Sequence, residues 1–223
     1  MSSGMQPSLP AELLTPEAFA AHAGVSRETL ARLEDYADLL RKWQNAINLV
    51  SNASLNDLWR RHIWDSAQLL PHIPAGAHSL LDLGSGAGFP GLVLAILGVD
   101  GVVLVEADKR KCAFLREAAR VTGTDVTIHD RRIEDIGDEI PPVDVITARA
   151  VASLPLLLER IKLYMIPNTV CLFHKGQQVE AELAEIRRIW SGEIEKIPSV
   201  TDAAGVIIRL KDKSNVEDDN VGC

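Results

Sequence analysis

The most informative stretch of this chain reads Leu81-Asp82-Leu83-Gly84-Ser85-Gly86-Ala87-Gly88-Phe89-Pro90-Gly91. It includes the end of a short apolar run, residues 79–83, that predicts a strand, and it leads into residues 90–97, which predict a helix. Glycines at 84, 86 and 88 permit positive φ angles and a close approach of the backbone to a ligand. Sheets of α/β proteins bind ligands beyond the carboxyl ends of their strands. The sequence therefore predicts an α/β domain with a ligand site at this turn.

Two carboxylates indicate which ligand the turn binds. Glu106 ends the next predicted strand, where a carboxylate can accept two hydrogen bonds from a ribose diol. Residues 86–91 also match the dinucleotide fingerprint G-x-G-x-x-G, but the match begins beyond Gly84, where the turn starts. Asp82 would place negative charge where a pyrophosphate binds, whereas it suits the amino group and sulfonium of S-adenosylmethionine. The sequence thus favours S-adenosylmethionine; a tight turn without a ligand is the structural alternative.

Strands and helices alternate in the prediction for the rest of the chain. Further strands are predicted at residues 102–106, 126–129, 143–147, 169–173, 194–197 and 205–210. Helices are predicted at residues 108–121, from 154 onward and at 179–190. Such alternation predicts a parallel sheet covered on both faces. The last two strands have no helix between them, so we expect an antiparallel hairpin that completes a mostly parallel, seven-stranded sheet with an antiparallel C-terminal strand.

Residues 1–74 predict a helical extension that precedes this sheet. Thr15 and Ser26 are typical N-caps, and residues 54–57 resemble a capping box that opens a third helix. Three tryptophans beside leucines favour core positions over base stacking: Trp43, Trp59 and Trp64. Pro71 and Pro74 end the extension. We expect a helical region at 1–74, a ligand-binding domain at 75–211 and an acidic, flexible tail at 212–223.

Composition places the chain among ordinary globular proteins. Its 223 residues are 47% hydrophobic and 24% charged, which suits one domain with an extension and excludes general disorder. The longest apolar stretch, residues 88–99, is shorter than the roughly 20 residues that span a membrane. The first residues do not resemble a secretory signal. The three cysteines form no Cys-x-x-Cys motif, so we expect a reduced, cytoplasmic protein without a metal site.

Charge is distributed unevenly along the chain. The net charge of −8 is opposite in sign to that of a simple basic nucleic-acid binder. Local basic clusters nevertheless occur on both sides of the glycine turn: Arg60-Arg61-His62, Lys109-Arg110-Lys111 and Arg131-Arg132. Arg60, Arg61 and His62 lie on nearly one helical turn, from which they can bind RNA phosphate. The alternative is a solvated helix face and, for His62, a structural role.

Four stretches in this order resemble the glucose-inhibited division protein B family. They are residues 81–91, Trp43-Gln44-Asn45-Ala46-Ile47-Asn48-Leu49, Arg61-His62-Ile63-Trp64-Asp65-Ser66 and Thr147-Ala148-Arg149-Ala150. The chain has Val50 where the family has Thr, and it also departs from the pattern at Ala87, Thr147 and Ala148, which leave the chemistry intact. The resemblance covers about residues 30–210. It implies a class I methyltransferase with a Rossmann-like fold, S-adenosylmethionine as cofactor, and methyl transfer to N7 of guanine 527 in 16S rRNA.

The turn and the resemblance together indicate the site residues. Cofactor contacts fall on Asp82, Gly84, Gly86, Gly88, Phe89, Glu106, Ile133, Glu134 and Arg149. The resemblance puts Ile133 and Glu134 beside the adenine and Arg149 where cofactor meets acceptor. Arg149 is therefore the catalytic candidate, able to bind guanine O6 or a flanking phosphate; the alternative is a salt bridge to a nearby carboxylate. Lys175 follows the fifth strand as an RNA contact or a loop start, and we expect Asp65 to anchor its helix.

The implied chemistry needs no general base, because guanine N7 carries a lone pair and no proton. The sequence agrees: no Asp/Asn-Pro-Pro-Tyr follows the fourth strand, and Cys112 and Cys171 fall at expected core positions. The implied partner is 16S rRNA in a structured or ribosomal-protein-bound form, with no membrane and no stable protein partner. Two alternatives stay open. One is a small-molecule methyltransferase with the same cofactor, and the other is a nucleotide-binding module such as an NAD sensor.

Overall fold

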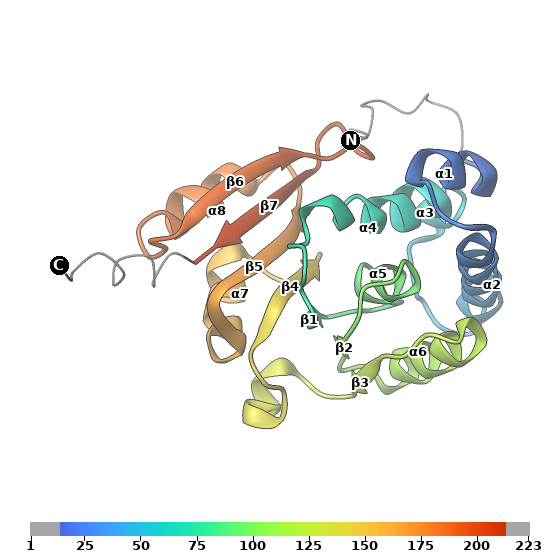
Figure 1. The fold of residues 1–223 in the computed structure, drawn as a ribbon, viewed down its shortest axis with the longest axis horizontal. Coiled ribbons are helices and arrows are strands. Elements are labelled where there is room, and N and C mark those ends of the chain that lie inside the picture. Colours follow the sequence, from blue (N-terminus) through green and yellow to red (C-terminus); the bar gives the residue numbers. More distant parts are fainter. Residues whose placement is uncertain (1–13, 213–223) are drawn as a thin grey trace.

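The computed structural model describes residues 14–212, and within them seven strands form one sheet (Figure 1). The strands are β1 Leu80–Leu83, β2 Val102–Val105, β3 Thr127–His129, β4 Val143–Arg149, β5 Met165–Lys175, β6 Glu193–Pro198 and β7 Val206–Lys211. Their order in the sheet is β3-β2-β1-β4-β5-β7-β6. Strand β7 runs antiparallel to both of its neighbours, and the other pairs are parallel. The predicted sheet and its closing hairpin are confirmed.

Strand β1 lies inside the sheet, between β2 and β4. It pairs with β2 on one side and with β4 on the other, and all four of its residues are buried. The chain moves outward from β1 to β2 and β3, and then returns past β1 to β4. This reversal of strand order is a topological switch point, where α/β sheets leave a crevice at the carboxyl ends of the strands. The glycine turn leaves β1 at that crevice.

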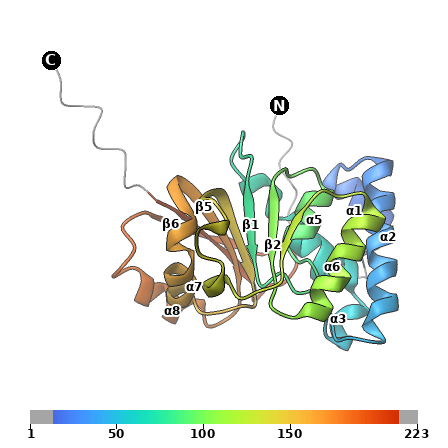
Figure 2. The same ribbon diagram turned by 90° about the horizontal axis from the view of Figure 1, so that it is seen from below.

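Helices cover both faces of the sheet (Figure 2). One face carries α1 Pro16–Ala23, α2 Arg27–Gln44, α5 Gly91–Ile96 and α6 Lys109–Thr122. The other face carries η3 Ile133–Asp135, η4 Gly137–Glu139, α7 Leu154–Ile161, η5 Lys162–Tyr164 and α8 Val179–Ile186. The predicted caps Thr15 and Ser26 are confirmed, since each side chain accepts a backbone N–H bond. None of the helices within residues 14–212 is long and apolar enough to cross a membrane.

The third predicted helix is broken into short pieces, and its predicted cap is wrong. The pieces are α3 Asn52–Leu55, the π-helix η1 Trp59–Trp64, α4 Asp65–Ala67 and η2 Leu70–His72. Ser51 caps α3 by accepting from the N–H of Ser54. The Ser54 hydroxyl is instead shared between the Ser51 carbonyl and the His62 ring. A π-helical turn contains one residue more than an α-helical turn, and such turns are frequent at functional sites.

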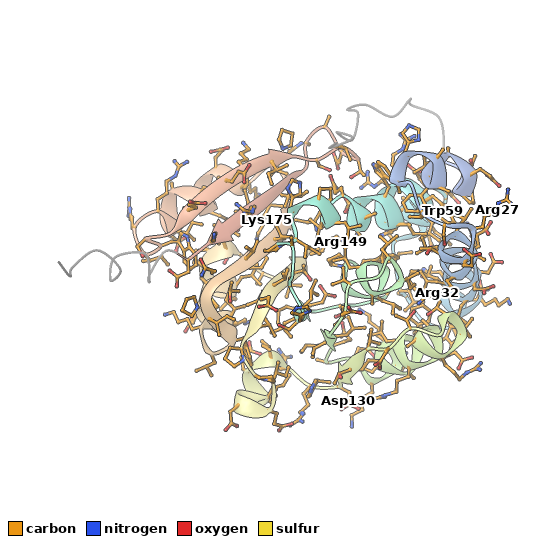
Figure 3. All side chains as sticks on the ribbon, in the orientation of Figure 1. Arg27, Arg32, Trp59, Asp130, Arg149 and Lys175 are labelled. Carbon is orange, nitrogen blue, oxygen red and sulfur yellow. The ribbon has the colours of Figure 1, made fainter. Side chains whose placement is uncertain are left out.

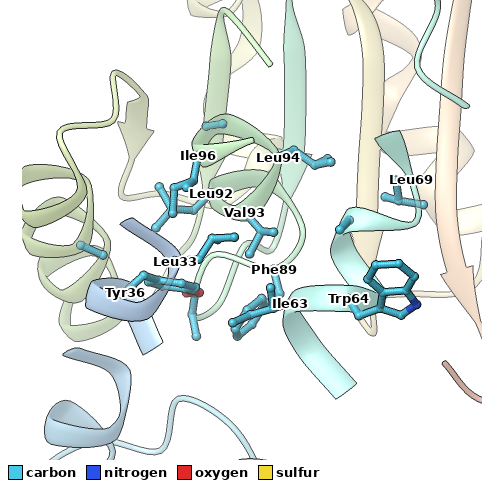
Figure 4. Packing of buried hydrophobic residues seen from close by; sticks show 14 of the residues in the cluster. Leu33, Tyr36, Ile63, Trp64, Leu69, Phe89, Leu92, Val93, Leu94 and Ile96 are labelled. Atoms are coloured by element: carbon cyan, nitrogen blue, oxygen red, sulfur yellow. The ribbon is translucent and has the colours of Figure 1, made fainter. Parts of the chain in front are cut away.

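The helical extension packs directly onto α5 and α6. Phe19 contacts the buried rings of Trp59 and Trp64, each at 5.5 Å between centroids. Trp43 packs on Phe114 of α6 at 5.7 Å. The preference for core tryptophans is therefore confirmed. Figure 4 shows the same cluster continuing through Tyr36 to the α5 side chains. The boundary at residue 74 stays a proposal, and residues 213–223 of the predicted tail lie outside the described residues.

Candidate functional site

The glycine turn bends through left-handed backbone positions that glycine adopts without strain. The φ angles are +61° at Gly84 and +98° at Gly88. A Cβ at Gly84 would lie 2.7 Å from a methyl group of Val151, and one at Gly88 would lie 2.8 Å from the Cβ of Leu92. Neither position therefore tolerates a side chain without movement of its neighbours. The turn is closely packed against the segment that follows β4 and against α5.

Asp82 lies beneath this turn with its carboxylate fully buried. One oxygen accepts from Thr147 Oγ1 on β4 at 2.7 Å, and the other accepts from the N–H of Gly91 at 3.2 Å. Burial raises the pKa of Asp82 to about 6, against the lowering effect of the Thr147 hydrogen bond. The carboxylate thus joins β1, β4 and the start of α5. Asp82 is fully buried and does not line the pocket beside the turn, which favours a role in shaping the turn over the predicted direct contact with the amino group and sulfonium.

Glu106 faces the turn from the end of β2. Its Oε2 accepts from the N–H of Gly86 and its Oε1 accepts from the N–H of Asp108, both at 2.8 Å. It lines a pocket of about 150 Å³, which we call the turn pocket. The other lining residues include Gly84, Val105, Ile133, Glu134 and Val151. The structure therefore brings together Gly84, Glu106, Ile133 and Glu134, while Asp82, Gly86, Gly88 and Phe89 lie outside this lining.

The outer wall of the turn pocket comes from the segment after β3. Ile133 is buried, and its carbonyl accepts from the Tyr164 hydroxyl at 3.1 Å. Glu134 forms a 2.6 Å ion pair with Arg160, which also lines the pocket. The lining combines apolar side chains with two carboxylates and three arginines, Arg131, Arg132 and Arg160. Such a lining is typical of a site for a nucleoside, whose ring is apolar and whose ribose is polar.

Arg149, at the end of β4, is held by several partners from the helical extension. It donates to Asp65 Oδ2 at 3.1 Å, to the Arg61 carbonyl at 3.0 Å and to His62 Nδ1 at 2.6 Å. Its guanidinium lies 5.1 Å from the centroid of the Phe89 ring, a cation–π distance. The ion pair with a nearby carboxylate, considered from the sequence, is present. Asp65 also accepts from Thr201, so its predicted anchoring role is confirmed.

His62 is buried beside Arg149 and carries no charge. Its ring stacks on Phe89 at 4.7 Å, and its Nε2 is 2.9 Å from the Ser54 hydroxyl. Burial and the positive charge of Arg149 lower the pKa of His62 to about 3. A buried neutral ring is not suited to the phosphate contact expected from the sequence. The geometry favours the structural alternative, in which His62 orients Arg149.

The other residues expected to contact RNA differ in their exposure. Arg60 lies 3.8 Å from Asp57 with a mostly covered side chain. Lys175 is also mostly covered; it forms a 2.8 Å ion pair with Glu182 and donates to the Ala152 carbonyl. Arg61 has half of its side chain exposed. Arg61 is therefore the best placed of the three for an RNA contact, and all three roles stay predictions.

A second pocket, of about 260 Å³, lies on the other side of Arg149 and is called the Arg149 pocket here. Its lining includes Asp65, Arg149, Ala150, His174, Lys175 and Asp202. Figure 3 shows Arg149 and Lys175 near each other at the ends of β4 and β5. Arg149 and Ala150 line this pocket, and Val151 lines the turn pocket, so three consecutive residues connect the two. Within residues 14–212, no group of His, Cys, Asp and Glu forms a candidate metal site.

Sequence reasoning missed Tyr36, which supports the turn from the helical extension. Its ring is fully buried between Phe89 and Phe114, at 5.6 Å and 6.2 Å. Its hydroxyl donates a short hydrogen bond to the carbonyl of Ala87 in the turn. Burial raises the pKa of this hydroxyl, which keeps it a donor. The position of Tyr36 beside the apolar stripe of α2 gave no signal of this contact, because its partner is far away in sequence.

The buried carboxylate of Asp82 predicts an unusual dependence of stability on pH. Its folded pKa of about 6 lies above its ordinary value of 3.8, so its contribution to stability is complete below pH 3.8 and disappears as pH rises through 6. Asn at position 82 does not titrate. From pH 4 to pH 7.5, the unfolding free energy of the wild type minus that of Asp82→Asn should therefore fall by about 2 kcal/mol.

Urea unfolding of both proteins at the two pH values measures this difference. Asp144→Asn is the control, because backbone hydrogen bonds from His78 and Ser79 lower the pKa of Asp144. Its stabilising effect is present above its ordinary pKa and is lost only toward acid, so the corresponding difference for Asp144 must not fall over this range. A constant difference for Asp82→Asn would contradict the assignment of a raised pKa.

Comparisons with known proteins show the family of this chain. A family model described as GidB, rRNA small subunit methyltransferase G, matches residues 29–206. Ribosomal RNA small subunit methyltransferase G of Rhodospirillum rubrum is 53% identical over 197 residues, covering 88% of this chain and 97% of the relative. The protein of the same name from Rhodospirillum centenum is 52% identical over 204 residues, covering 92% and 94%.

Solved methyltransferase structures share the fold at low sequence identity. A ribosomal protein L11 methylase from Lactobacillus delbrueckii subsp. bulgaricus has a TM-score of 0.56 at 15% identity, covering 66% of this chain and 75% of that chain. A precorrin-6y C5,15-methyltransferase from Geobacter metallireducens has a TM-score of 0.54 at 12% identity, covering 74% and 91%. These likenesses concern the fold alone. By the family match and the high identity of its relatives, the chain belongs to the GidB family, rRNA small subunit methyltransferase G.

Proposed function

We propose that this protein transfers a methyl group from S-adenosylmethionine to N7 of a guanine in 16S rRNA, the guanine at position 527. The observation that carries the proposal is the pair of pockets at the end of β4. Residues 149–151 connect the turn pocket, whose lining suits a nucleoside, with the Arg149 pocket, which carries charged side chains and is large enough for part of a nucleotide. A donor and an acceptor can therefore meet at Arg149. The names of the relatives supply the RNA class.

The residues of the turn pocket fit S-adenosylmethionine. Glu106 can accept hydrogen bonds from a ribose diol, while Ile133 and Val105 present apolar surface for an adenine ring. Gly84 and Gly86 leave the backbone of the turn without side chains on the path from this pocket to Arg149. When bound, S-adenosylmethionine would supply a methyl group attached to a positively charged sulfur. Val151, which packs on Gly84, would cover that path and exclude water.

Guanine N7 has a free lone pair, so no side chain has to remove a proton. The neighbourhood of Arg149 agrees with this requirement: His62 is neutral and hydrogen bonded at both nitrogens, and Asp82 is buried and engaged. Catalysis then depends on holding the two reactants in line within a dry pocket, which can supply roughly 7–11 kcal/mol. Arg149 is the residue that we assign to this positioning, because it borders the acceptor side and is itself fixed from several directions.

The RNA substrate is proposed to be structured. The chain carries a net charge of −8, and several of its basic side chains near the site are already paired with carboxylates. Such a surface holds an unfolded RNA strand weakly, since binding of phosphates depends on free positive charge. A folded rRNA, with or without ribosomal proteins, offers shape in addition to charge. The target base must also leave its stack to reach the pocket.

Methylation of rRNA tests the proposed function directly. Purified protein and S-adenosylmethionine are incubated with each of three substrates. Two of them, small ribosomal subunits and naked 16S rRNA, come from a strain that lacks the gene, and the third is a short synthetic oligonucleotide. Nucleoside mass spectrometry should show 7-methylguanosine, and the rate should be highest with a structured substrate. Equal rates on all three substrates would contradict the need for structure. Transfer to small molecules alone would favour the second candidate, a small-molecule methyltransferase, which the acidic charge of the chain also allows.

Substitution of Glu106 tests the binding of the ribose. Glu106→Ala removes a charged acceptor from the turn pocket and also frees the N–H of Gly86, so the dissociation constant for S-adenosylmethionine should rise by about 10- to 100-fold. Calorimetry measures this constant. Glu117→Ala is the matched control, because Glu117 pairs with Arg120 on the surface of α6 and should leave the constant unchanged. Equal binding by both variants would remove Glu106 from the cofactor site.

Substitution of Arg149 tests the assignment of positioning. Arg149→Lys keeps the charge beside Asp65 but loses the planar set of donors to Arg61 and His62. We expect kcat to fall on the order of 100-fold, with the dissociation constant for S-adenosylmethionine changed less than threefold. Single-turnover methylation and calorimetry measure the two quantities. Arg116→Lys is the control at an exposed pair. Wild-type turnover by Arg149→Lys would exclude Arg149 from the reaction.

A further inference from the structure

The wall of the Arg149 pocket opposite β4 is formed by the turn between β6 and β7. Asp202 in this turn, with Gly205 and Val206 after it, lines the pocket together with Arg149 and Ala150. Strand β5 lies between β4 and β7 in the sheet. The two walls are therefore separated by two strand spacings, roughly 10 Å. This distance joins strand backbones, and the pocket volume of about 260 Å³ between them suits a purine ring.

Side chains from α4 and the residue after it hold the β6–β7 turn firmly in place. Gln68 accepts from the N–H of Val200 at 2.9 Å and donates to Ser199 Oγ at 3.2 Å. Asp65 accepts from Thr201 Oγ1 at 2.5 Å. Because Asp65 also holds Arg149, the two walls of the pocket share an anchor. The position of the turn relative to Arg149 is thus fixed by the fold.

The pocket offers hydrogen-bond acceptors beside its two cations. Arg149 and Lys175 pair with Asp65 and Glu182. The ring of His174 is buried, its Nε2 donates to the Asp65 carbonyl, and its Nδ1 has no partner in the described chain. A ligand that carries N–H groups can therefore bind to acceptors in this pocket.

Asp202 is the exposed acceptor among these groups. Its Oδ1 accepts from the N–H of Ala204 at 2.9 Å, which fixes the carboxylate. Its Oδ2 lies 3.9 Å from Arg61, beyond hydrogen-bond distance, and nearly half of the side chain is exposed. Among residues 14–212, no donor reaches this oxygen within hydrogen-bond distance. It is free to accept from a ligand.

Guanine carries its N–H groups on the edge that would face Asp202. Its N7 and O6 are acceptors on one edge, whereas its N1–H and N2 amino group are donors on the other side of the ring. A guanine with N7 toward β4 and the turn pocket therefore directs its donors toward β7. Adenine has a lone pair at N1 and no N2 amino group, so it would face the carboxylate with an acceptor. A site built to accept hydrogen bonds rejects an analogue that lacks the donors.

We propose that Asp202 selects guanine as the acceptor base by accepting hydrogen bonds from its N1–H and N2 amino group in the Arg149 pocket. This inference rests on the proposed function and adds the residue that determines base specificity. Asp202 is not needed for cofactor binding, because it lies across Arg149 from the turn pocket. Its contribution is confined to the acceptor, so it affects the RNA substrate and leaves the affinity for S-adenosylmethionine unchanged.

The test combines a protein variant with removal of one atom group from the base. Small subunits are reconstituted with either guanosine or inosine at the nucleotide that the wild type methylates; inosine keeps N7 and N1–H but lacks the N2 amino group. For the wild type, kcat/KM should fall about tenfold with inosine. Asp202→Asn keeps an oxygen for the N–H of Ala204, and on guanosine its kcat/KM should fall about 10- to 100-fold. Its further loss with inosine should stay below threefold.

Control variants distinguish a loss of base recognition from a loss of folding and from a loss of methyl transfer itself. Asp130→Asn, at an exposed pair with Arg116, should behave as the wild type on both substrates. Asp202→Ser, which keeps a hydroxyl near Ala204, should reproduce the loss if the Asn variant is unstable. Equal inosine penalties in wild type and variant, or wild-type rates for Asp202→Asn on guanosine, would overturn the role of Asp202 alone. Failure of the wild type to methylate any guanine would overturn the proposed function as well.

Discussion

The buried carboxylate of Asp82 holds together the elements that make the site. It receives the first N–H of α5 from Gly91 and the hydroxyl of Thr147 on β4, so the strand before the glycine turn, the helix after it and the neighbouring strand converge on one side chain. Gly91 has no room for a side chain, since a Cβ there would lie 2.6 Å from the Cβ of Asp82. Burial of this charge costs stability above its pKa of about 6. A neutral, hydrogen-bonded side chain at position 82 would not carry this cost. The presence of a carboxylate there agrees with a role in the site.

The helical extension completes the same site from the opposite side. Tyr36 donates to the carbonyl of Ala87 in the turn, His62 stacks on Phe89 and accepts from Arg149, and Asp65 pairs with Arg149. These side chains come from α2, η1 and α4, elements that precede the sheet in sequence. The extension therefore holds the turn and Arg149 in place as well as covering α5 and α6.

The sequence predicted the features that depend on local patterns and missed those that depend on distant partners. Glycines at alternate positions, N-cap serine and threonine, and alternating strands and helices each act over a few residues, and the structure confirms the turn, the caps and the sheet. The burial of Asp82 follows from its place in a central strand, but its partner Thr147 lies 65 residues away. The cap predicted at Ser54 was wrong because the helix begins earlier, with Ser51 as its N-cap, and the Ser54 hydroxyl bonds to the Ser51 carbonyl and the His62 ring instead. Asp202 carried no motif at all, and the sheet order together with the contacts of Asp65 and Gln68 places it across the pocket from Arg149.

On the proposed function, the distribution of charge around Arg149 suits a reaction that moves a positive charge from the donor to a purine. Arg149 alone would repel the purine as it becomes positive. Its charge is offset by Asp65 at 3.1 Å, and Asp202 adds a carboxylate at the far wall. His62, which contacts Arg149, stays neutral because it is buried beside that cation. The acceptor side thus combines a fixed guanidinium, which sets the geometry, with carboxylates that favour the charged product. Orientation and electrostatic stabilisation therefore come from different residues of one network.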